Sequence, residues 1–132
     1  MSFVHHCRLL FADTDASGRI HHSAIFRYFE AAEAEFFRAA GVPYSYLDTL
    51  GARYPRVRVE ADFYGPLKDD DLLDISVTVE RVGKSSFTLA FDVDVNNCTR
   101  AHGKIIICCM DPSNKCSCPI PAQLIDVLKK HV

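Results

Sequence analysis

Two carboxylates, a glycine and two histidines lie close together near the start of the chain. Residues 13–22 read DTDASGRIHH and lead directly into a segment with helical periodicity. The first N–H groups of a helix lack partners within it and lie at the positive end of its dipole, so they stabilise negative charge on a substrate oxygen. We therefore interpret this loop as a candidate acyl-transfer site. Asp15 would be the nucleophile or general base, and the backbone N–H near His22 would be the oxyanion donor.

Each of these residues also has a structural interpretation. An Asp in a loop before a helix often forms an Asx turn or caps the helix, and we expect Asp13 to hydrogen-bond the loop. The side chain of His22 could contact the substrate or carry a proton, but its backbone role is the stronger expectation. Gly18 would matter if it adopts a positive φ or lets the substrate approach the backbone. We interpret Glu30 and Glu33 as part of a solvated helix face.

The loop must be positioned by the helix that follows it. Apolar residues recur at helical spacing and predict a helix over 23–40, with a wide apolar face that the rest of the chain must cover. Ser23 is the expected N-cap. Gly41 is the expected residue after the helix, and Pro43 prevents its continuation.

The segments that would cover this helix have the residue patterns of strands and are separated by turn signals. We predict strands over 3–11, 54–64, 72–82, 87–95 and 101–110, with a short helical piece at 44–50 and a C-terminal helix over 122–131. Turns are expected at 83–86 and 96–97. Consecutive antiparallel strands with one long helix predict an α+β fold, in which a single curved sheet surrounds that helix.

Two blocks of this sequence resemble the hotdog-fold thioesterase superfamily, and within it the 4-hydroxybenzoyl-CoA thioesterase and YbgC-type acyl-CoA thioesterase branch. The first block is DTDASG at 13–18 with His22 and FRYFEAA at 26–32. The second runs from ADFYGP at 61–66 through Asp71 to GKSSF at 83–87. The resemblance extends from about residue 4 to residue 110. It implies a hotdog fold, a curved antiparallel five-stranded sheet wrapped around one long central helix.

The resemblance also implies a reaction and an assembly. Asp15 would be the catalytic carboxylate and the amide at or near His22 the oxyanion contact, in an enzyme that hydrolyses an acyl-CoA or acyl carrier protein thioester. Two protomers would join edge to edge into one sheet, as a homodimer or within a homotetramer, and CoA would be held partly by the neighbouring chain. The exposed edges of a five-stranded sheet favour such pairing on their own.

Substrate contacts are expected from charge and from position in the loop. Arg56, Arg58, Arg81 and Lys84 are candidates for binding CoA phosphates or the pantetheine region, although ordinary surface charge is the alternative. Gly18 and His21 are the candidates within the loop. Arg19 and His21 depart from the family pattern, in which an apolar and an aromatic residue are usual at these positions.

Other chemistries find less support. There is no G-x-S-x-G, P-loop or dinucleotide-binding motif, so we expect no cofactor. We expect no metal, because adjacent strand residues such as His5 and His6 point to opposite faces, and the cysteines at 108, 109, 116 and 118 lack the spacing of zinc knuckles. A non-catalytic acyl-CoA-binding module and a hotdog dehydratase or hydratase remain the alternative functions.

Global properties give further expectations. The 132 residues suit a single domain, 1–132. A net charge of -2 without a basic stripe disfavours nucleic acid binding. The longest apolar run, 105–110, is too short to span a membrane, and no signal peptide pattern is visible. We therefore expect a cytoplasmic protein whose six cysteines stay reduced.

Overall fold

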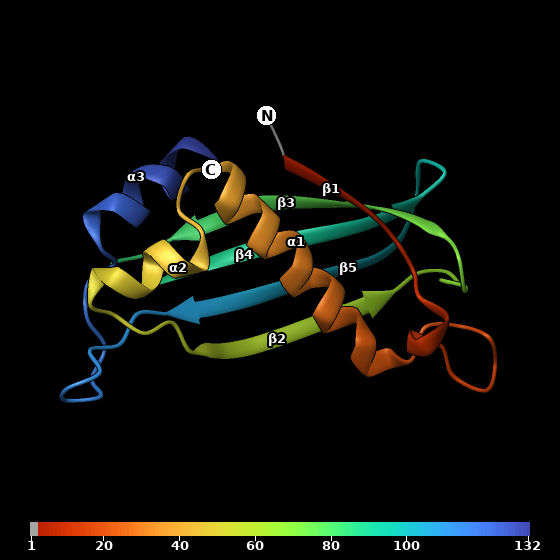
Figure 1. The fold of residues 1–132 in the computed structure, drawn as a ribbon, viewed down its shortest axis with the longest axis horizontal. Helices are drawn as coiled ribbons and strands as arrows, with labels where there is room; N and C mark the ends of the chain where they lie inside the picture. Colours follow the sequence, from red (N-terminus) through yellow and green to blue (C-terminus); the bar gives the residue numbers. More distant parts are fainter. Residues whose placement is uncertain (1–2) are drawn as a thin grey trace.

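The computed structural model describes residues 3–132 and shows a curved five-stranded sheet with helices against one face (Figure 1). Neighbouring strands are antiparallel, in the order β1-β3-β4-β5-β2. The strands are β1 Phe3–Arg8, β2 Arg56–Phe63, β3 Leu72–Val82, β4 Ser86–Val95 and β5 Cys98–Cys108. The helices are α1 Ile25–Ala39, α2 Tyr44–Leu47 and α3 Ala122–Lys130, with 3-10 turns at Phe11–Asp13, His22–Ala24 and Asp48–Leu50. The expected α+β arrangement is confirmed, with two shorter helices beside the long one.

Helix α1 lies across the sheet because its apolar side chains fit against the middle strands. Phe29 is fully buried and stacks on Phe91 of β4, with ring centroids 4.7 Å apart. The helix comes close to β5 at Gly103, where an added Cβ would overlap the ring of Phe29 and lie 2.8 Å from the carbonyl oxygen of Glu60. A glycine at this position therefore allows the aromatic core to form beneath the helix.

The two ends of α1 differ in how well the sequence predicts them. At the C-terminal end Gly41 has φ +85 and donates to the carbonyl of Arg38, while Val42 donates to that of Phe37. This is the Schellman pattern that a glycine after a helix indicates. The expected N-cap at Ser23 is wrong. His21 caps the 3-10 turn that precedes α1, and its side chain accepts a hydrogen bond from the N–H of Ser23.

Several strand boundaries differ from those expected by one to three residues, and two of them differ by three. The first strand stops at Arg8, because Leu9 donates to the carbonyl of Asp71 and the chain then turns. The last strand begins at Cys98 rather than at 101. Asn96 and Asn97 both have positive φ, 51 and 63, and form a two-residue hairpin that lets pairing start at once.

Strand β2 forms one edge of the sheet and is poorly covered. Val59, Ala61 and Phe63 pair with residues of β5 that face the helices, so these side chains lie on the helix side of the sheet. Val59 is nevertheless 48% exposed and Phe63 43% exposed. The helices of this chain therefore leave apolar surface of β2 open to solvent.

No helix in residues 3–132 is both long enough and apolar enough to cross a membrane.

Candidate active site

The loop that contains Asp15 is a short turn closed by backbone hydrogen bonds. Asp15 donates to the carbonyl of Arg19 at 2.8 Å, and Gly18 donates to the carbonyl of Asp15 at 3.0 Å. Gly18 has φ +81, a conformation that residues with a Cβ rarely adopt, and open space surrounds the position where a Cβ would be. A glycine is thus favoured at position 18 by the backbone conformation of this turn, not by a clash that a side chain would make.

The carboxylate of Asp15 is exposed and held by one neighbour. Its Oδ1 accepts hydrogen bonds from the N–H of Ser17 at 2.8 Å and from the hydroxyl of Ser17 at 2.6 Å. These bonds hold the pKa of Asp15 below its ordinary value. The contacts form the Asx turn of the structural interpretation, yet they engage Oδ1 alone.

Asp13 connects the loop to α1. Its carboxylate is buried, pairs with Arg27 and accepts a hydrogen bond from the hydroxyl of Tyr28 at 2.5 Å. The same hydroxyl accepts from the N–H of Leu10 at 2.9 Å, and the carbonyl of Asp13 accepts from His21 at 2.8 Å. Hydrogen bonds from Arg27 and Tyr28 hold the pKa of Asp13 below its usual value. Asp13 therefore hydrogen-bonds the loop, as expected.

The two histidines stand at the junction between the loop and the helix. The Nδ1 of His21 lies 2.8 Å from the hydroxyl of Ser23, and its ring stacks on that of His22 with centroids 4.4 Å apart. His22 is the first residue of the 3-10 turn that runs into α1, and within residues 3–132 its N–H donates to no acceptor. This N–H is thus available to an oxygen of a bound molecule.

Asp15 and His22 line the same cavity, of about 200 Å³. The end of β2 and the segment after it complete the lining, which comprises Asp15, Ser17, Arg19, Ile20, His22, Phe63, Gly65, Pro66 and Leu67. Sequence reasoning did not assign Ser17 or Arg19 a role here. The Asp-x-Ser spacing of an Asx turn was a signal for Ser17. An acidic residue and a residue with a free backbone N–H that line one cavity suit attack on a carbonyl group.

The basic residues expected to contact CoA lie elsewhere in the protomer. Arg58 lies on the face of β2 away from the helices, where its Nε is 3.8 Å from the carboxylate of Glu60. Lys84 belongs to the turn between β3 and β4, and its carbonyl accepts from Ile120 at 3.0 Å. Arg81, near the end of β3, is exposed close to that turn. This end of the sheet is opposite to the Asp15 loop (Figure 1).

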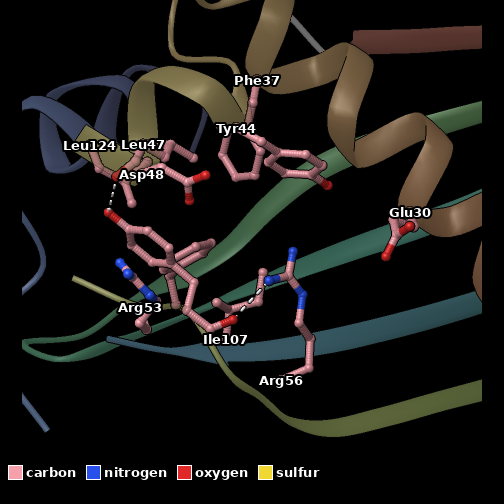
Figure 2. A pocket seen from close by; sticks show the side chains of 11 residues that line it. Glu30, Phe37, Tyr44, Leu47, Asp48, Arg53, Arg56, Ile107 and Leu124 are labelled. Carbon is pink, nitrogen blue, oxygen red and sulfur yellow. Dashed lines mark hydrogen bonds between the residues drawn. The ribbon is translucent and has the colours of Figure 1, made fainter. Parts of the chain in front are cut away.

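Arg56 lines a second and larger cavity, of about 440 Å³ (Figure 2). All three helices and the sheet contribute to its walls: Glu30, Phe37, Tyr44, Leu47, Asp48, Arg53, Tyr54, Arg56, Phe87, Ile107 and Leu124. Glu30 is an exposed residue of α1 that reaches this cavity. The sequence offered no indication that helices and strands far apart along the chain would enclose such a space.

Glu33 lies behind this cavity and corrects an expectation. The sequence reading places it on a solvated face, but it is fully buried. Its Oε2 accepts hydrogen bonds from Tyr44 and Arg56, whereas Oε1 has no partner within residues 3–132. Burial raises the pKa of Glu33 above its ordinary value, although Arg56 opposes this effect. Glu33 lies four residues after Phe29 and three before Phe36, which places it on the apolar stripe of α1. This signal was available in the sequence.

The cysteines carry free thiols, and burial raises the pKa of Cys109 to about 12. Within residues 3–132 no group of three or more His, Cys, Asp or Glu side chains could hold a metal ion.

Comparison with known proteins identifies the family. Residues 9–128 match the model of the thioesterase-like superfamily. The chain is 24% identical over 132 residues to 1,4-dihydroxy-2-naphthoyl-CoA hydrolase of Nostoc punctiforme, covering 99% of this chain and 89% of the relative. It is 22% identical over 125 residues to the acyl-CoA thioester hydrolase YbgC of Escherichia coli O6:H1, covering 93% and 92%.

A solved structure extends this likeness to three dimensions. The crystal structure of a hypothetical protein from Aquifex aeolicus superimposes with a TM-score of 0.90 at 31% identity, covering 96% of this chain and 98% of that one. The resemblance found in the two sequence blocks is thereby confirmed. The chain belongs to the thioesterase-like superfamily.

Proposed function

We propose that the protein hydrolyses an acyl-CoA thioester to the free acid and CoA at the cavity lined by Asp15 and His22. The observation that carries this proposal is that one cavity is lined both by Asp15, whose carboxylate is exposed, and by His22, whose N–H donates to no acceptor within residues 3–132. The depressed pKa of Asp15 keeps its carboxylate ionised at neutral pH, the form that either route of attack requires. Membership in the thioesterase-like superfamily supports the same reaction.

In the proposed reaction, negative charge develops on the thioester oxygen and is stabilised by the N–H of His22. Asp15 either removes a proton from water, whose oxygen adds to the carbonyl carbon, or adds itself to form an anhydride that water then hydrolyses. In both routes the C–S bond breaks and CoA leaves as a thiolate, which is protonated by solvent. Losing one oxyanion donor typically lowers the rate about 100- to 1000-fold.

We also propose that the active form is a homodimer, or a homotetramer built from such dimers, joined through β2. This edge strand exposes apolar side chains on the side of the sheet where helices pack, at Val59 and Phe63. A second copy pairing antiparallel would cover them and would satisfy the free backbone groups of the edge. Val59→Lys would place a charge in the proposed interface, so we expect sedimentation to show monomers. Residue 59 is already half exposed in the folded protomer, so the variant should still fold.

The first test of the function is hydrolysis of a panel of short, medium, long and aromatic acyl-CoA esters. The absorbance of the thioester itself should be followed, because the six cysteines would react with thiol reagents. Hydrolysis of at least one ester is the expected result. Tight binding of acyl-CoA without hydrolysis of any ester would instead identify a non-catalytic binding module.

A further inference from the structure

The N–H proposed as the oxyanion donor belongs to the peptide unit that joins His21 to His22. The carbonyl of this unit, which His21 carries, accepts a hydrogen bond from the N–H of Ala24 at 2.8 Å. Because the atoms of a peptide unit lie close to one plane, a hydrogen bond that fixes the carbonyl also fixes the direction of the N–H. The orientation of the His22 N–H therefore depends on His21 and on the turn that begins after it.

The backbone of His21 is held from the loop side. Its N–H donates to the carbonyl of Asp13 at 2.8 Å, and the carboxylate of Asp13 is fixed in turn by Arg27 and Tyr28. His21 is extended, with φ -65 and ψ 133, as is typical of the residue that precedes a first helical turn. The Asp13 network thus defines how the chain enters the turn.

The imidazole of His21 holds the turn from the other side, as its cap. Its Nδ1 accepts from the N–H of Ser23 at 3.3 Å and lies 2.8 Å from the hydroxyl of the same residue. A backbone N–H can only donate, so Nδ1 carries no proton in this arrangement and the ring proton of the neutral imidazole is on Nε2. Asn, Asp or Ser usually supplies the acceptor at this position. Without an acceptor, the first residues of the turn would lose the contact that holds them together.

The position of His21 separates it from the substrate. Among the described residues, His22 lines the Asp15 cavity and His21 does not. The ring of His21 is exposed and stacks on that of His22, with centroids 4.4 Å apart. An effect of His21 on the reaction would therefore pass through His22. Because the side chain is exposed, its replacement leaves no cavity in the core and the variants should fold.

We infer that His21 is a positioning residue for thioester hydrolysis: by capping the turn His22–Ala24 through Nδ1, it directs the N–H of His22 at the oxygen on which negative charge develops. This inference rests on the proposed function and adds the group that orients its oxyanion donor. A donor that is already oriented needs no reorganisation as the charge develops. The contribution of His21 should therefore appear in kcat rather than in KM.

Three substitutions of His21 separate its acceptor from its ring. In His21→Asn the side-chain oxygen can accept from Ser23 as an ordinary N-cap, but the ring is lost. In His21→Gln the amide lies one methylene group further from the backbone, and in His21→Ala there is no acceptor. Each variant is assayed on the best ester of the panel, at a temperature at which a thermal melt shows it to be folded.

The expected pattern follows from the cap. His21→Gln and His21→Ala should lower kcat about 5-fold or more and change KM less than about 2-fold, the size of effect that loss of an N-cap produces. His21→Asn should stay within about 2-fold of wild type. The loss in His21→Ala should be smaller than the roughly 100- to 1000-fold loss of an oxyanion donor, because the N–H of His22 is still present.

His6→Ala is the matched control. His6 is an exposed histidine of β1 whose replacement also removes one hydrogen bond, to Asp74 at 2.6 Å, and it lines neither the Asp15 cavity nor the larger one. The kcat of this variant should equal that of wild type, because an exposed pair of this kind contributes little.

Three results would overturn the inference while leaving thioester hydrolysis intact. They are an unchanged kcat in His21→Ala and His21→Gln, a kcat in His21→Asn as low as in His21→Ala, and an effect confined to KM. If His21→Ala does not fold, the comparison of His21→Asn with His21→Gln decides the question. A wild-type protein that hydrolyses no ester would instead refute the proposed function, and this inference with it.

Discussion

Replacing Tyr28 by Phe should destabilise the protein by removing one oxygen that makes two hydrogen bonds. This hydroxyl donates to the buried carboxylate of Asp13 at 2.5 Å and accepts from the N–H of Leu10 at 2.9 Å. A hydrogen bond to a charged group contributes about 1.5–3 kcal/mol, and a backbone N–H left without a partner costs about 1–3 kcal/mol. Because the Leu10 N–H is only partly buried, we take the lower part of its range and expect a total loss of about 3 kcal/mol.

Urea denaturation at a fixed protein concentration measures this loss, since association of subunits would otherwise contribute to it. Tyr46→Phe is the matched control. Tyr46 is 39% exposed, its hydroxyl makes no hydrogen bond within residues 3–132, and its removal should change the free energy of unfolding by less than about 0.5 kcal/mol. If the two variants unfold at the same urea concentration, the link between Asp13 and Tyr28 does not hold the loop as described.

Three further predictions concern other parts of the chain. Ser17→Ala should raise the pKa of Asp15 by removing its largest stabilising contact, so the fall of kcat/KM on acidification should begin at a higher pH than in wild type; a pH–rate profile that does not move would refute this. Gly103→Ala should lower the free energy of unfolding by about 1–3 kcal/mol in a thermal melt, because the added Cβ would overlap the ring of Phe29. An unchanged free energy of unfolding would show that α1 can move away from β5. Cys109, buried and with a pKa raised to about 12, should stay unmodified when iodoacetamide labels the exposed cysteines of the native protein, as mass spectrometry would show.

The sequence predicted the elements well wherever a local pattern governs the backbone. Gly41 after the helix and the Asn96–Asn97 turn take the positive φ values that these residue types favour. The apolar spacing of α1 indicated its buried face. The missed N-cap has a local cause as well, because the 3-10 turn His22–Ala24 precedes α1 and His21 caps that turn.

The candidate site was only partly predictable, because its parts come from distant segments. Asp15, Gly18 and His22 lie in one loop, and the sequence brings them together directly. Phe63, which lines the same cavity, depends on how β2 ends beside that loop. The orientation of Arg56 depends on a shift of register in β2, between Arg56 and Arg58, that no residue pattern predicted.

Burial of a charged residue was the hardest feature to predict. Glu33 lies on the apolar stripe of α1, but a carboxylate there is usually read as solvated. Its partners, Arg56 and Tyr44, are 23 and 11 residues away. Only the packing of α2 and β2 against α1 reveals that Arg56 compensates the charge of Glu33.

The most direct test of the central claim is the rate of thioester hydrolysis in Asp15→Asn, followed by thioester absorbance on the best ester of the panel. Asp126→Asn, an exposed aspartate on α3, serves as the control. We predict that Asp15→Asn lowers kcat/KM at least about 100-fold, which corresponds to about 2.7 kcal/mol of lost transition-state stabilisation, while the control stays near wild type. An Asp15→Asn variant as fast as wild type would contradict the proposed mechanism and would require a different carboxylate at the site.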